Sequence, residues 1–245
     1  MSRPPRKTGN RLSSLLGKLR QLFLRALLAF GVISVLLVLM FRWIPPPASS
    51  LMVQHTLQDL WSGEGLKEIH YRWMPFEDMS PHLALAVVAA EDQKFPDHWG
   101  FDLGSIAQAL EEYLQGGRMR GASTISQQVV KNLFLWPGRS FVRKGLEAWF
   151  TMLVEALWPK RRILELYLNI VELGDHVFGV EAASRRFFNK PASRLSRQEA
   201  ALLAAVLPNP LRYRVEAPSA HVRQRQRWIL GQMNQLGGQR YLENL

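Results

Sequence analysis

Residues 81–100 have the sequence PHLALAVVAAEDQKFPDHWG, in which an apolar run is followed abruptly by charged and turn-forming residues. The apolar part predicts a helix over residues 81–92, since proline is favoured in a first helical turn. Glu91 and Asp92 then lie at the end of a hydrophobic helix. A carboxylate that leaves such a helix at a cleft can have a raised pKa and take part in proton transfer. The alternative is a pair of solvated acids at a helix end.

The rest of the chain beyond residue 100 continues this helical pattern. Asp102 can cap a helix over residues 104–115, and Ser140 can cap a long helix that continues to Trp158 and ends before Pro159. Further helices are predicted over residues 124–134, 160–171, 179–187, 196–206 and 221–236. Only residues 66–73 alternate enough to indicate a short strand. The predicted fold class is therefore all-α, with any sheet minor.

Charge and composition narrow the possible functions. The formal net charge is +11, yet eight of the 31 Lys and Arg residues and no acid lie in residues 1–42, so the remaining chain carries only +3. That balance argues against nucleic acid as a partner. The chain has no cysteine, which excludes disulfides, cysteine-based metal sites and a thiol nucleophile.

The N-terminal segment has the features of a membrane anchor. Residues 26–41 are uncharged, and with the apolar residues on either side they predict a transmembrane helix over residues 22–44. Arg, Trp, Ile and three prolines follow, where a cleaved signal peptide would have small residues, so an uncleaved anchor is favoured. Basic residues before the span place the tail, residues 1–21, in the cytoplasm. Residues 45–52 are then a linker, and residues 53–245 a periplasmic domain attached to the inner membrane.

A second candidate site begins at Gly121–Asn132, GASTISQQVVKN. Hydroxyl groups and free backbone N–H groups at a helix start suit an anion or a sugar, although an ordinary capped helix would have the same sequence. The polar side chains concerned are Ser123, Gln127 and Gln128.

Four cations follow within 14 positions: Lys131, Arg139, Arg143 and Lys144. A helical hairpin across Pro137 and Gly138 would bring them to one phosphate or pyrophosphate group. Arg143 and Glu147 are four residues apart, and a surface ion pair on one helix is the simpler interpretation of these two.

Other charged and aromatic residues have simpler explanations. Glu165 and Glu199 lie in packing helices, where a structural role is favoured over catalysis. Aromatic and apolar residues are unusually dense around the helix that starts near Ser140. They are Trp136, Trp149, Phe150, Met152, Leu153, Leu157 and Trp158. Core packing is the default interpretation, and contact with a bilayer interface is the alternative.

Several segments, in this order over about 120 residues, resemble the peptidoglycan glycosyltransferases of family 51, which include the N-terminal domains of bifunctional penicillin-binding proteins. The matching segments are Glu91–Gly100 (EDQKFPDHWG), Gly121–Phe134 (GASTISQQVVKNLF), Arg143–Glu147 (RKGLE), Ile163–Asn169 (ILELYLN), Gly179–Phe188 (GVEAASRRFF) and Glu199–Pro210 (EAALLAAVLPNP). No S-x-x-K motif of a transpeptidase occurs, so the chain is similar to the monofunctional, membrane-anchored members.

The resemblance implies a lysozyme-like fold and polymerisation of lipid II. An acceptor hydroxyl attacks C1 of N-acetylmuramic acid, the configuration inverts and undecaprenyl pyrophosphate leaves. Glu91 resembles the general base, and Glu147 resembles a second acid that assists at the pyrophosphate directly or through Mg²⁺ or Mn²⁺. Lys131 and Arg139 resemble the groups that neutralise the pyrophosphate. Ser123, Gln127 and Gln128 resemble substrate contacts, and Asp92, Phe95 and His98 resemble the residues that shape the first motif. Arg143 and Lys144 are further candidate substrate-binding residues.

Two other functions remain open at this level. A glycan-cleaving enzyme can have a similar scaffold, but it needs no cluster of cations. A non-catalytic scaffold tethered among the wall-building proteins would not need Glu91 at all. The partners implied by the resemblance are lipid II, the growing glycan strand, the bilayer and other cell-wall synthesis or division proteins.

Overall fold

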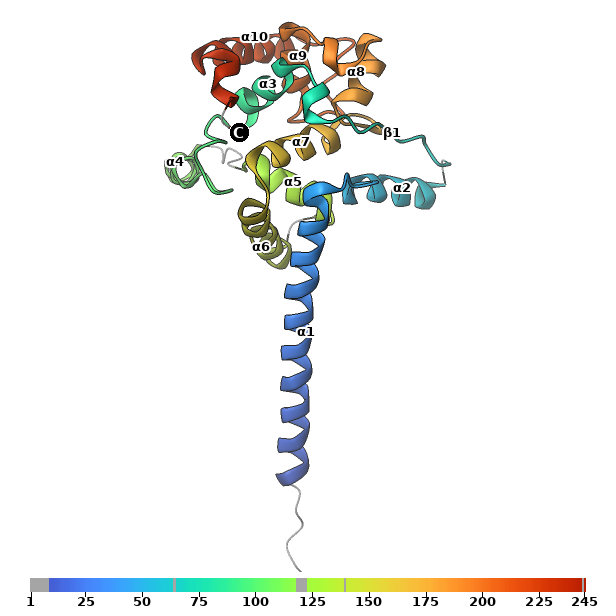
Figure 1. Cartoon of the computed structure of the whole chain (residues 1–245), viewed down its shortest axis with the longest axis vertical. Helices are drawn as coiled ribbons and strands as arrows, with labels where there is room; N and C mark the ends of the chain where they lie inside the picture. The colour runs from blue at the N-terminus through green and yellow to red at the C-terminus, as the bar shows by residue number, and fades with distance from the viewer. Residues whose placement is uncertain (1–8, 64, 118–122, 139, 244) are drawn as a thin grey trace, which may run out of the picture. The chain divides into compact units, whose positions relative to one another are not determined.

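The computed structural model of the chain describes residues 9–63, 65–117, 123–138, 140–243 and 245 (Figure 1). It divides into two compact units, one that ends at Trp43 and one from Ile44 to Leu245. The first unit contains helix α1 (Gly9–Trp43). The second contains all the other helices and the strands among the described residues.

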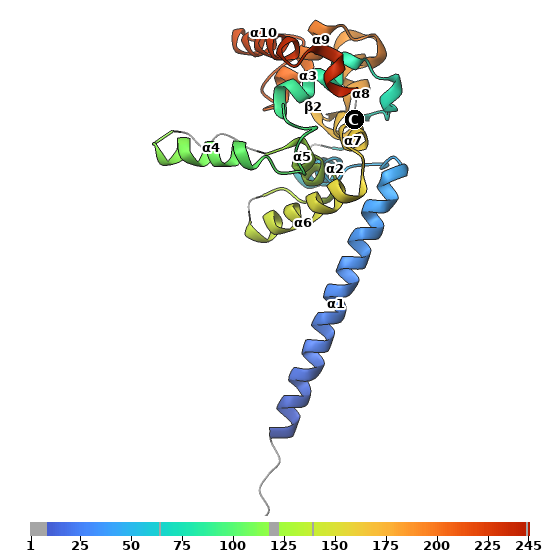
Figure 2. The ribbon, with the colours of Figure 1, turned by 60° about the vertical axis from the view of Figure 1, so that its left-hand side comes forward.

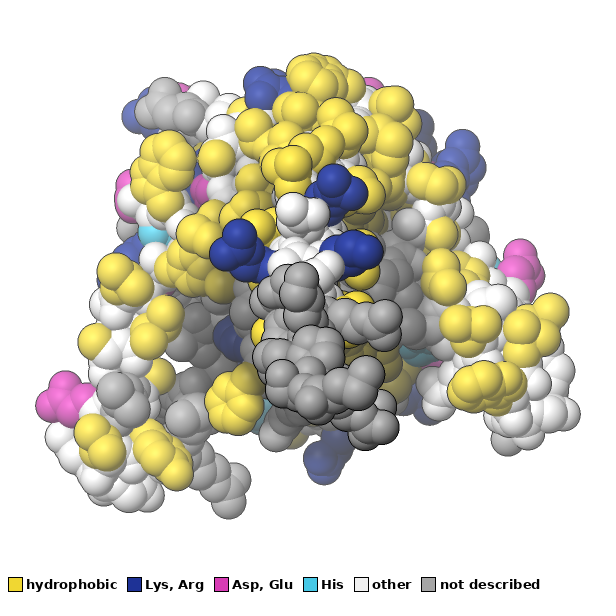
Figure 3. Space-filling model, turned by 90° about the horizontal axis from the view of Figure 1, so that it is seen from below, with side chains coloured by type: hydrophobic (Ala, Val, Ile, Leu, Met, Phe, Trp, Pro, Cys, Tyr) yellow, Lys and Arg dark blue, Asp and Glu magenta, His cyan; other side chains and the backbone are white. Residues whose placement is uncertain are grey.

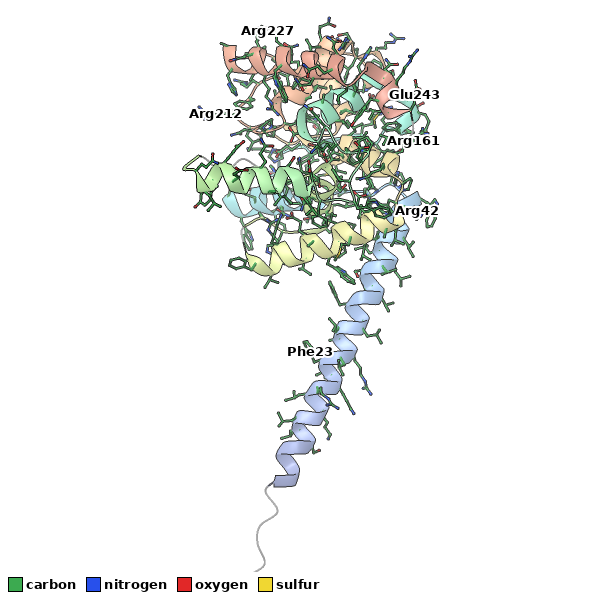
Figure 4. The ribbon with its side chains drawn as sticks, turned by 90° about the vertical axis from the view of Figure 1, so that its left-hand side faces the viewer. Phe23, Arg42, Arg161, Arg212, Arg227 and Glu243 are labelled. Atoms are coloured by element: carbon green, nitrogen blue, oxygen red, sulfur yellow. The ribbon has the colours of Figure 1, made fainter. Side chains whose placement is uncertain are left out.

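Helix α1 is long and apolar enough from Ser14 to Trp43, 30 residues, to cross a membrane by length and composition. Most of its side chains from Ser14 to Trp43 are exposed, and the labelled Phe23 in Figure 4, which is 66% exposed, projects from the helix. This confirms the predicted apolar helix near the N-terminus. The helix begins well before residue 22, because the sequence from Gly9 to Trp43 contains no proline.

The helices of the second unit lie within one or two residues of their predicted positions, with one addition, α2. They are α2 (Ser50–Ser62), α3 (Pro81–Glu91), α4 (Leu103–Leu114), α5 (Ile125–Phe134), α6 (Phe141–Leu157), α7 (Lys160–Ile170), α8 (Val180–Phe188), α9 (Arg197–Val206) and α10 (Ala220–Gln235). Short 3-10 helices cover Phe76–Asp78, Ala192–Arg194 and Gly238–Leu242. The all-α fold class is confirmed.

Two groups of helices form this unit. Helix α3 packs against α9 and α10, and α5 packs against α6 and α7, with α7 also in contact with α3 (Figures 1 and 2). All residues of α3 from Leu83 to Ala89 are buried, so this helix is surrounded by protein. Its last residue, Glu91, therefore emerges where the two groups meet.

Side-chain caps explain where several helices begin. Thr124 and Gln127 form a reciprocal capping box at the start of α5, and Ser196 and Glu199 form another at the start of α9. The Ser49 hydroxyl accepts a hydrogen bond from the Met52 backbone N–H at 3.2 Å and starts α2 at Ser50. The predicted linker, residues 45–52, is therefore too long, since its last three residues form the first turn of a helix.

A small sheet, absent from the sequence prediction except for one strand, completes the unit. Strand β1 (His70–Tyr71) pairs in parallel with β3 (Val177–Phe178), which pairs antiparallel with β2 (Glu172–Gly174). The predicted strand over residues 66–73 is thus reduced to two residues. Strands β2 and β3 were missed because two or three residues are too short to show alternation.

The aromatic helix α6 has both a core face and an exposed face. Phe150 and Trp158 are buried, and the Phe150 ring stacks on Phe134 with ring centroids 4.9 Å apart. Phe150 and Trp158 therefore belong to the core. The exposed apolar residues of α6 are Phe141, Val142 and Met152, and Phe141 is 99% exposed. Figure 3 shows many hydrophobic side chains at the surface of the chain, with Lys and Arg side chains among them.

Candidate active site

Glu91 is the last residue of α3, and its carboxylate is held from two other helices. One oxygen, Oε1, forms an ion pair with the Arg225 guanidinium of α10 at 3.1 Å, and Oε2 accepts a hydrogen bond from the Gln128 amide of α5 at 3.2 Å. Burial raises the pKa of Glu91, and the contacts with Gln128, Arg225 and Lys131 oppose that rise. A raised pKa makes the carboxylate a stronger proton acceptor than an ordinary glutamate.

Gln128 is itself oriented by Tyr167 of α7. The Tyr167 hydroxyl donates to Gln128 Oε1 at 3.1 Å. Burial raises the pKa of Tyr167 well above its usual value, so the hydroxyl keeps its proton. With its carbonyl oxygen accepting from Tyr167, Gln128 must present its NH₂ group to Glu91. This chain of hydrogen bonds fixes the direction of the Glu91 carboxylate.

The turn after Glu91 is held in place by hydrogen bonds within the turn and to the start of α5. Asp92 accepts hydrogen bonds from His98 Nε2 at 2.9 Å and from the Ile125 backbone N–H, at the start of α5, at 3.0 Å. His98 Nδ1 accepts from the Gly100 backbone N–H at 3.1 Å. Phe95 has no exposed surface. Asp92, Phe95 and His98 thus shape the motif and tie it to α5, and Asp92 also lines the cavity beside Glu91.

A cavity of about 330 Å³ adjoins Glu91 and is lined on its other side by Ser123, Thr124 and Ser105. Ser123 is exposed, and its hydroxyl is available from the cavity. The structure therefore brings Ser123 and Glu91 to one opening, as a shared substrate site requires.

Lys131 lies one helical turn beyond Gln128 on α5, on the same side of that helix. Within the described part of the chain its ammonium group forms no hydrogen bond or ion pair. Desolvation lowers the pKa of Lys131 even though its side chain reaches the surface; Arg143 and Lys144 lower it further, whereas Glu147 and Glu91 raise it. Lys131 and Arg143 line a cavity of about 390 Å³ together with Gln54 and Trp136.

Glu147 is buried on α6 between two cations of its own helix. Its Oε1 accepts from the Lys144 ammonium at 2.5 Å, and its Oε2 lies 3.4 Å from an Arg143 guanidinium nitrogen. The ion pair with Arg143 is the one the spacing predicted. Arg143 Nε is buried and has no hydrogen-bond partner among the described residues. Glu147 therefore holds a cationic surface in place.

Three further predicted residues have different outcomes. Gln127 is buried and its Oε1 accepts from the Thr124 backbone N–H at 3.1 Å, so it caps α5. Arg139 lies outside the described residues. Glu165 accepts from the Phe76 backbone N–H at 3.1 Å and pairs with Arg162, a structural role like that of Glu199 in its capping box.

Two residues of the site were not identified from the sequence. Arg225 is the charged partner of Glu91, and the only sequence signal for it was the basic helix of residues 221–236. Glu155 is buried, pairs with Lys160 at 2.9 Å and accepts a hydrogen bond from Ser126.

A side chain at Gly100 (φ 77°) would come within 2.6 Å of Thr151 and 2.9 Å of Glu155. This close approach explains a glycine at the end of the first motif.

The fold and site define a class of protein. A poorly exposed carboxylate near a group of cations in a helical domain is an arrangement that suits an enzyme. A family model described as transglycosylase matches residues 58–234, and the chain belongs to this family.

Similar proteins cover almost the whole chain. A biosynthetic peptidoglycan transglycosylase of Cronobacter sakazakii is 56% identical over 229 residues, which are 94% of this chain and 95% of that protein. A protein of the same name from Pectobacterium carotovorum is 57% identical over 93% of this chain and 94% of its own length. A third protein of this name, from Yersinia pestis, is 58% identical over 84% of this chain and 86% of its own length.

Proposed function

We propose that this chain is a peptidoglycan glycosyltransferase that polymerises lipid II into glycan strands during cell-wall synthesis. The observation that carries the proposal is the arrangement on α5, where Gln128 orients the carboxylate of Glu91 and Lys131 follows one turn later. Membership of the transglycosylase family and the names of the similar proteins support the same activity.

The reaction needs one proton acceptor and one site of positive charge. Glu91 takes the proton of the acceptor 4-hydroxyl as its oxygen attacks C1 of N-acetylmuramic acid on the lipid-linked chain. The bond between C1 and the pyrophosphate oxygen breaks, the configuration at C1 inverts, and the bonding electrons leave with undecaprenyl pyrophosphate. Lys131 and Arg139 stabilise the charge that develops on the leaving group.

Arg143, Lys144 and Glu147 complete the anion site. Because Glu147 neutralises part of the charge of its two neighbours and holds them in place, it acts as a positioning residue for the cations. Among the described residues only one carboxylate is available there, and both of its oxygens already contact cations. This donor set does not fit a resident Mg²⁺ or Mn²⁺ site, so we derive no step through a metal.

The enzyme works at a membrane in this proposal. Helix α1 serves as a single-pass anchor in the inner membrane with the tail in the cytoplasm and the catalytic domain in the periplasm, since basic residues precede the apolar span. Anchoring raises the local concentration of the enzyme beside a lipid-borne substrate. The exposed apolar residues Phe141, Val142 and Met152 of α6 fit contact with a lipid surface.

The test is incubation of the full chain with purified lipid II in detergent. Growth of a glycan polymer together with release of prenyl pyrophosphate is expected. If the protein only shortens existing glycan, it is a cleaving enzyme and the proposal is wrong. If it does neither, while a Glu91→Gln variant restores wall synthesis in cells as well as the unaltered chain does, the protein is a scaffold.

A further inference from the structure

A second cluster of titratable side chains lies outside the catalytic site, where α2 meets the turn between β2 and β3. One ligand atom from each of His55, Asp175 and His176 lies within 4.8 Å of the others. His55 comes from α2, while the other two form the turn of the small sheet. We propose that these three residues form a binding site for a transition-metal cation of the zinc class.

The hydrogen bonds of His176 prepare it as a ligand. Its Nε2 lies 3.0 Å from an Asp59 oxygen, and its Nδ1 lies 2.7 Å from an Asp175 oxygen. A carboxylate behind a histidine holds the N–H on the far side of the ring and leaves the other nitrogen free to bind a metal. Asp59, which also accepts the Lys67 backbone N–H at 3.2 Å, is such a carboxylate. A cation then binds between His176 Nδ1 and Asp175, in place of their direct contact.

His55 has a similar arrangement. Its ring packs edge-on against the rings of His176 and Phe178, with centroid distances of 5.0 and 5.5 Å. Its Nε2 lies 3.4 Å from Glu172 Oε1, and that oxygen is buried and has no hydrogen-bond partner among the described residues. A buried acceptor without a donor is costly, and it gains one when the imidazole turns an N–H towards it. Each histidine of the cluster thus has a carboxylate beside it.

The donor set selects the metal. Two imidazole nitrogens and one carboxylate oxygen suit Zn²⁺, which is commonly bound by three protein ligands and a water, whereas Mg²⁺ and Ca²⁺ prefer sites made of oxygen alone. The backbone of His176 has φ 57°, a left-handed conformation, and its carbonyl oxygen accepts from the His70 N–H at 2.8 Å. This hydrogen bond holds the turn in a conformation that leaves ligand atoms of Asp175 and His176 within 4.8 Å of one from His55.

Metal binding at this place joins α2 to the sheet. The residue before His55 is Gln54, whose amide donates to the Leu135 carbonyl oxygen at 2.9 Å and lines the cavity that contains Lys131 and Arg143. A cation on the cluster therefore stabilises one wall of that cavity. The site is separate from the catalytic carboxylate, and its existence does not depend on the reaction proposed above.

The test is calorimetric titration of the full chain with Zn²⁺, after chelation of bound metal and removal of any polyhistidine tag. One Zn²⁺ per chain is expected, with a rise in the melting temperature, and no such binding of Mg²⁺. Asp175→Asn and His55→Gln should each abolish the stoichiometric binding, and Asp59→Asn should weaken it about 10–100-fold. His221→Gln changes an exposed histidine of α10 and is the matched control.

The Asp175 side chain is 64% exposed, so Asp175→Asn keeps the fold, and its circular dichroism spectrum checks this. The proposal is overturned if Zn²⁺ shows no saturable binding, or if both Asp175→Asn and His55→Gln bind it as tightly as the unaltered chain. Polymerisation of lipid II, measured on the same preparations, separates failure of this site from failure of the proposed function.

Discussion

Glu91 and Glu147 are both poorly exposed carboxylates, with side-chain exposures of 15% and 4%, but their surroundings differ. The partners of Glu91 come from α5 and α10, and burial raises its pKa. Both oxygens of Glu147 contact cations three and four residues away on its own helix. Glu91 is therefore equipped to accept a proton, and Glu147 to organise positive charge. The comparison teaches that the source of the partners separates the two roles better than burial does.

The largest effect is expected from Glu91→Gln. The amide retains the shape of the side chain but cannot accept the proton, so turnover should fall about 10²–10⁴-fold. Polymer formation from lipid II measures this, with substrate binding followed separately and expected to persist. Glu68→Gln, at an exposed position, is the control and should be fully active. Near-normal turnover of Glu91→Gln would remove Glu91 from the reaction.

Lys131→Ala comes next. The ammonium group of Lys131 forms no hydrogen bond or ion pair within the described part of the chain, so its charge is available to a substrate. Loss of one donor to developing charge should lower turnover on the order of 10²–10³-fold. Lys144→Ala is the matched control, since its exposed ammonium is already paired with Glu147, and a smaller loss is expected. Equal losses in single-turnover assays would mean that the two cations act in the same way.

Glu147→Gln should have an intermediate effect. Losing the charged hydrogen bonds to Arg143 and Lys144 should cost about 1.5–3 kcal/mol, and turnover should fall roughly 10–100-fold through misplaced cations. Thermal unfolding should show the loss of stability, and kinetics the loss of rate. If instead this variant is as inactive as Glu91→Gln and equally stable, the two carboxylates share the chemistry and the contrast drawn above is wrong.

Two adjacent glutamines sharpen the comparison further. Gln128→Ala removes the group that orients Glu91 and should lower turnover about tenfold, the equivalent of one hydrogen bond. Gln127→Ala removes only a capping interaction of α5 and should lower the free energy of unfolding by about 1 kcal/mol with turnover unchanged. Assays of rate and of chemical denaturation on both variants check this. Reversed results would show that Gln127 contacts the substrate.

The smallest expected effect is a shift in the pH dependence of the polymerisation rate. Glu91 must be ionised to accept a proton, so activity should fall as pH drops through its raised pKa. Lys131 must be protonated, so activity should fall as pH rises through its lowered pKa. Because Arg225 lowers the pKa of Glu91, Arg225→Gln should move the acidic limb of the rate profile to higher pH. Arg225→Lys retains the positive charge, so the acidic limb of its rate profile should lie close to that of the unaltered chain. If the acidic limb does not move in Arg225→Gln, the ion pair between Arg225 and Glu91 does not control the pKa of Glu91.

Local sequence signals predicted most of the helices. Caps such as Thr124 and Ser140 and breakers such as Pro159 act within one turn, so helix ends can be inferred without knowing the neighbours. Helix α2 and strands β2 and β3 were missed, because their patterns are short and their stability comes from contacts far away in the chain. The candidate residues Glu91, Gln128, Lys131 and Glu147 were singled out from local sequence patterns, and the resemblance to known motifs supplied the roles expected of them.

The sequence by itself determined the helical fold class, the apolar anchor segment and the transglycosylase family, and it singled out Glu91 as the candidate base. These depend on periodicity, composition and motifs, which are local properties of the chain. The tertiary structure alone decided that Arg225, 134 positions from Glu91, is its partner, and that Gln127 caps a helix while Gln128 contacts the Glu91 carboxylate. It also placed His55 beside the Asp175–His176 turn. Such pairings cannot be read from spacing, because they arise only when packing brings distant helix faces together.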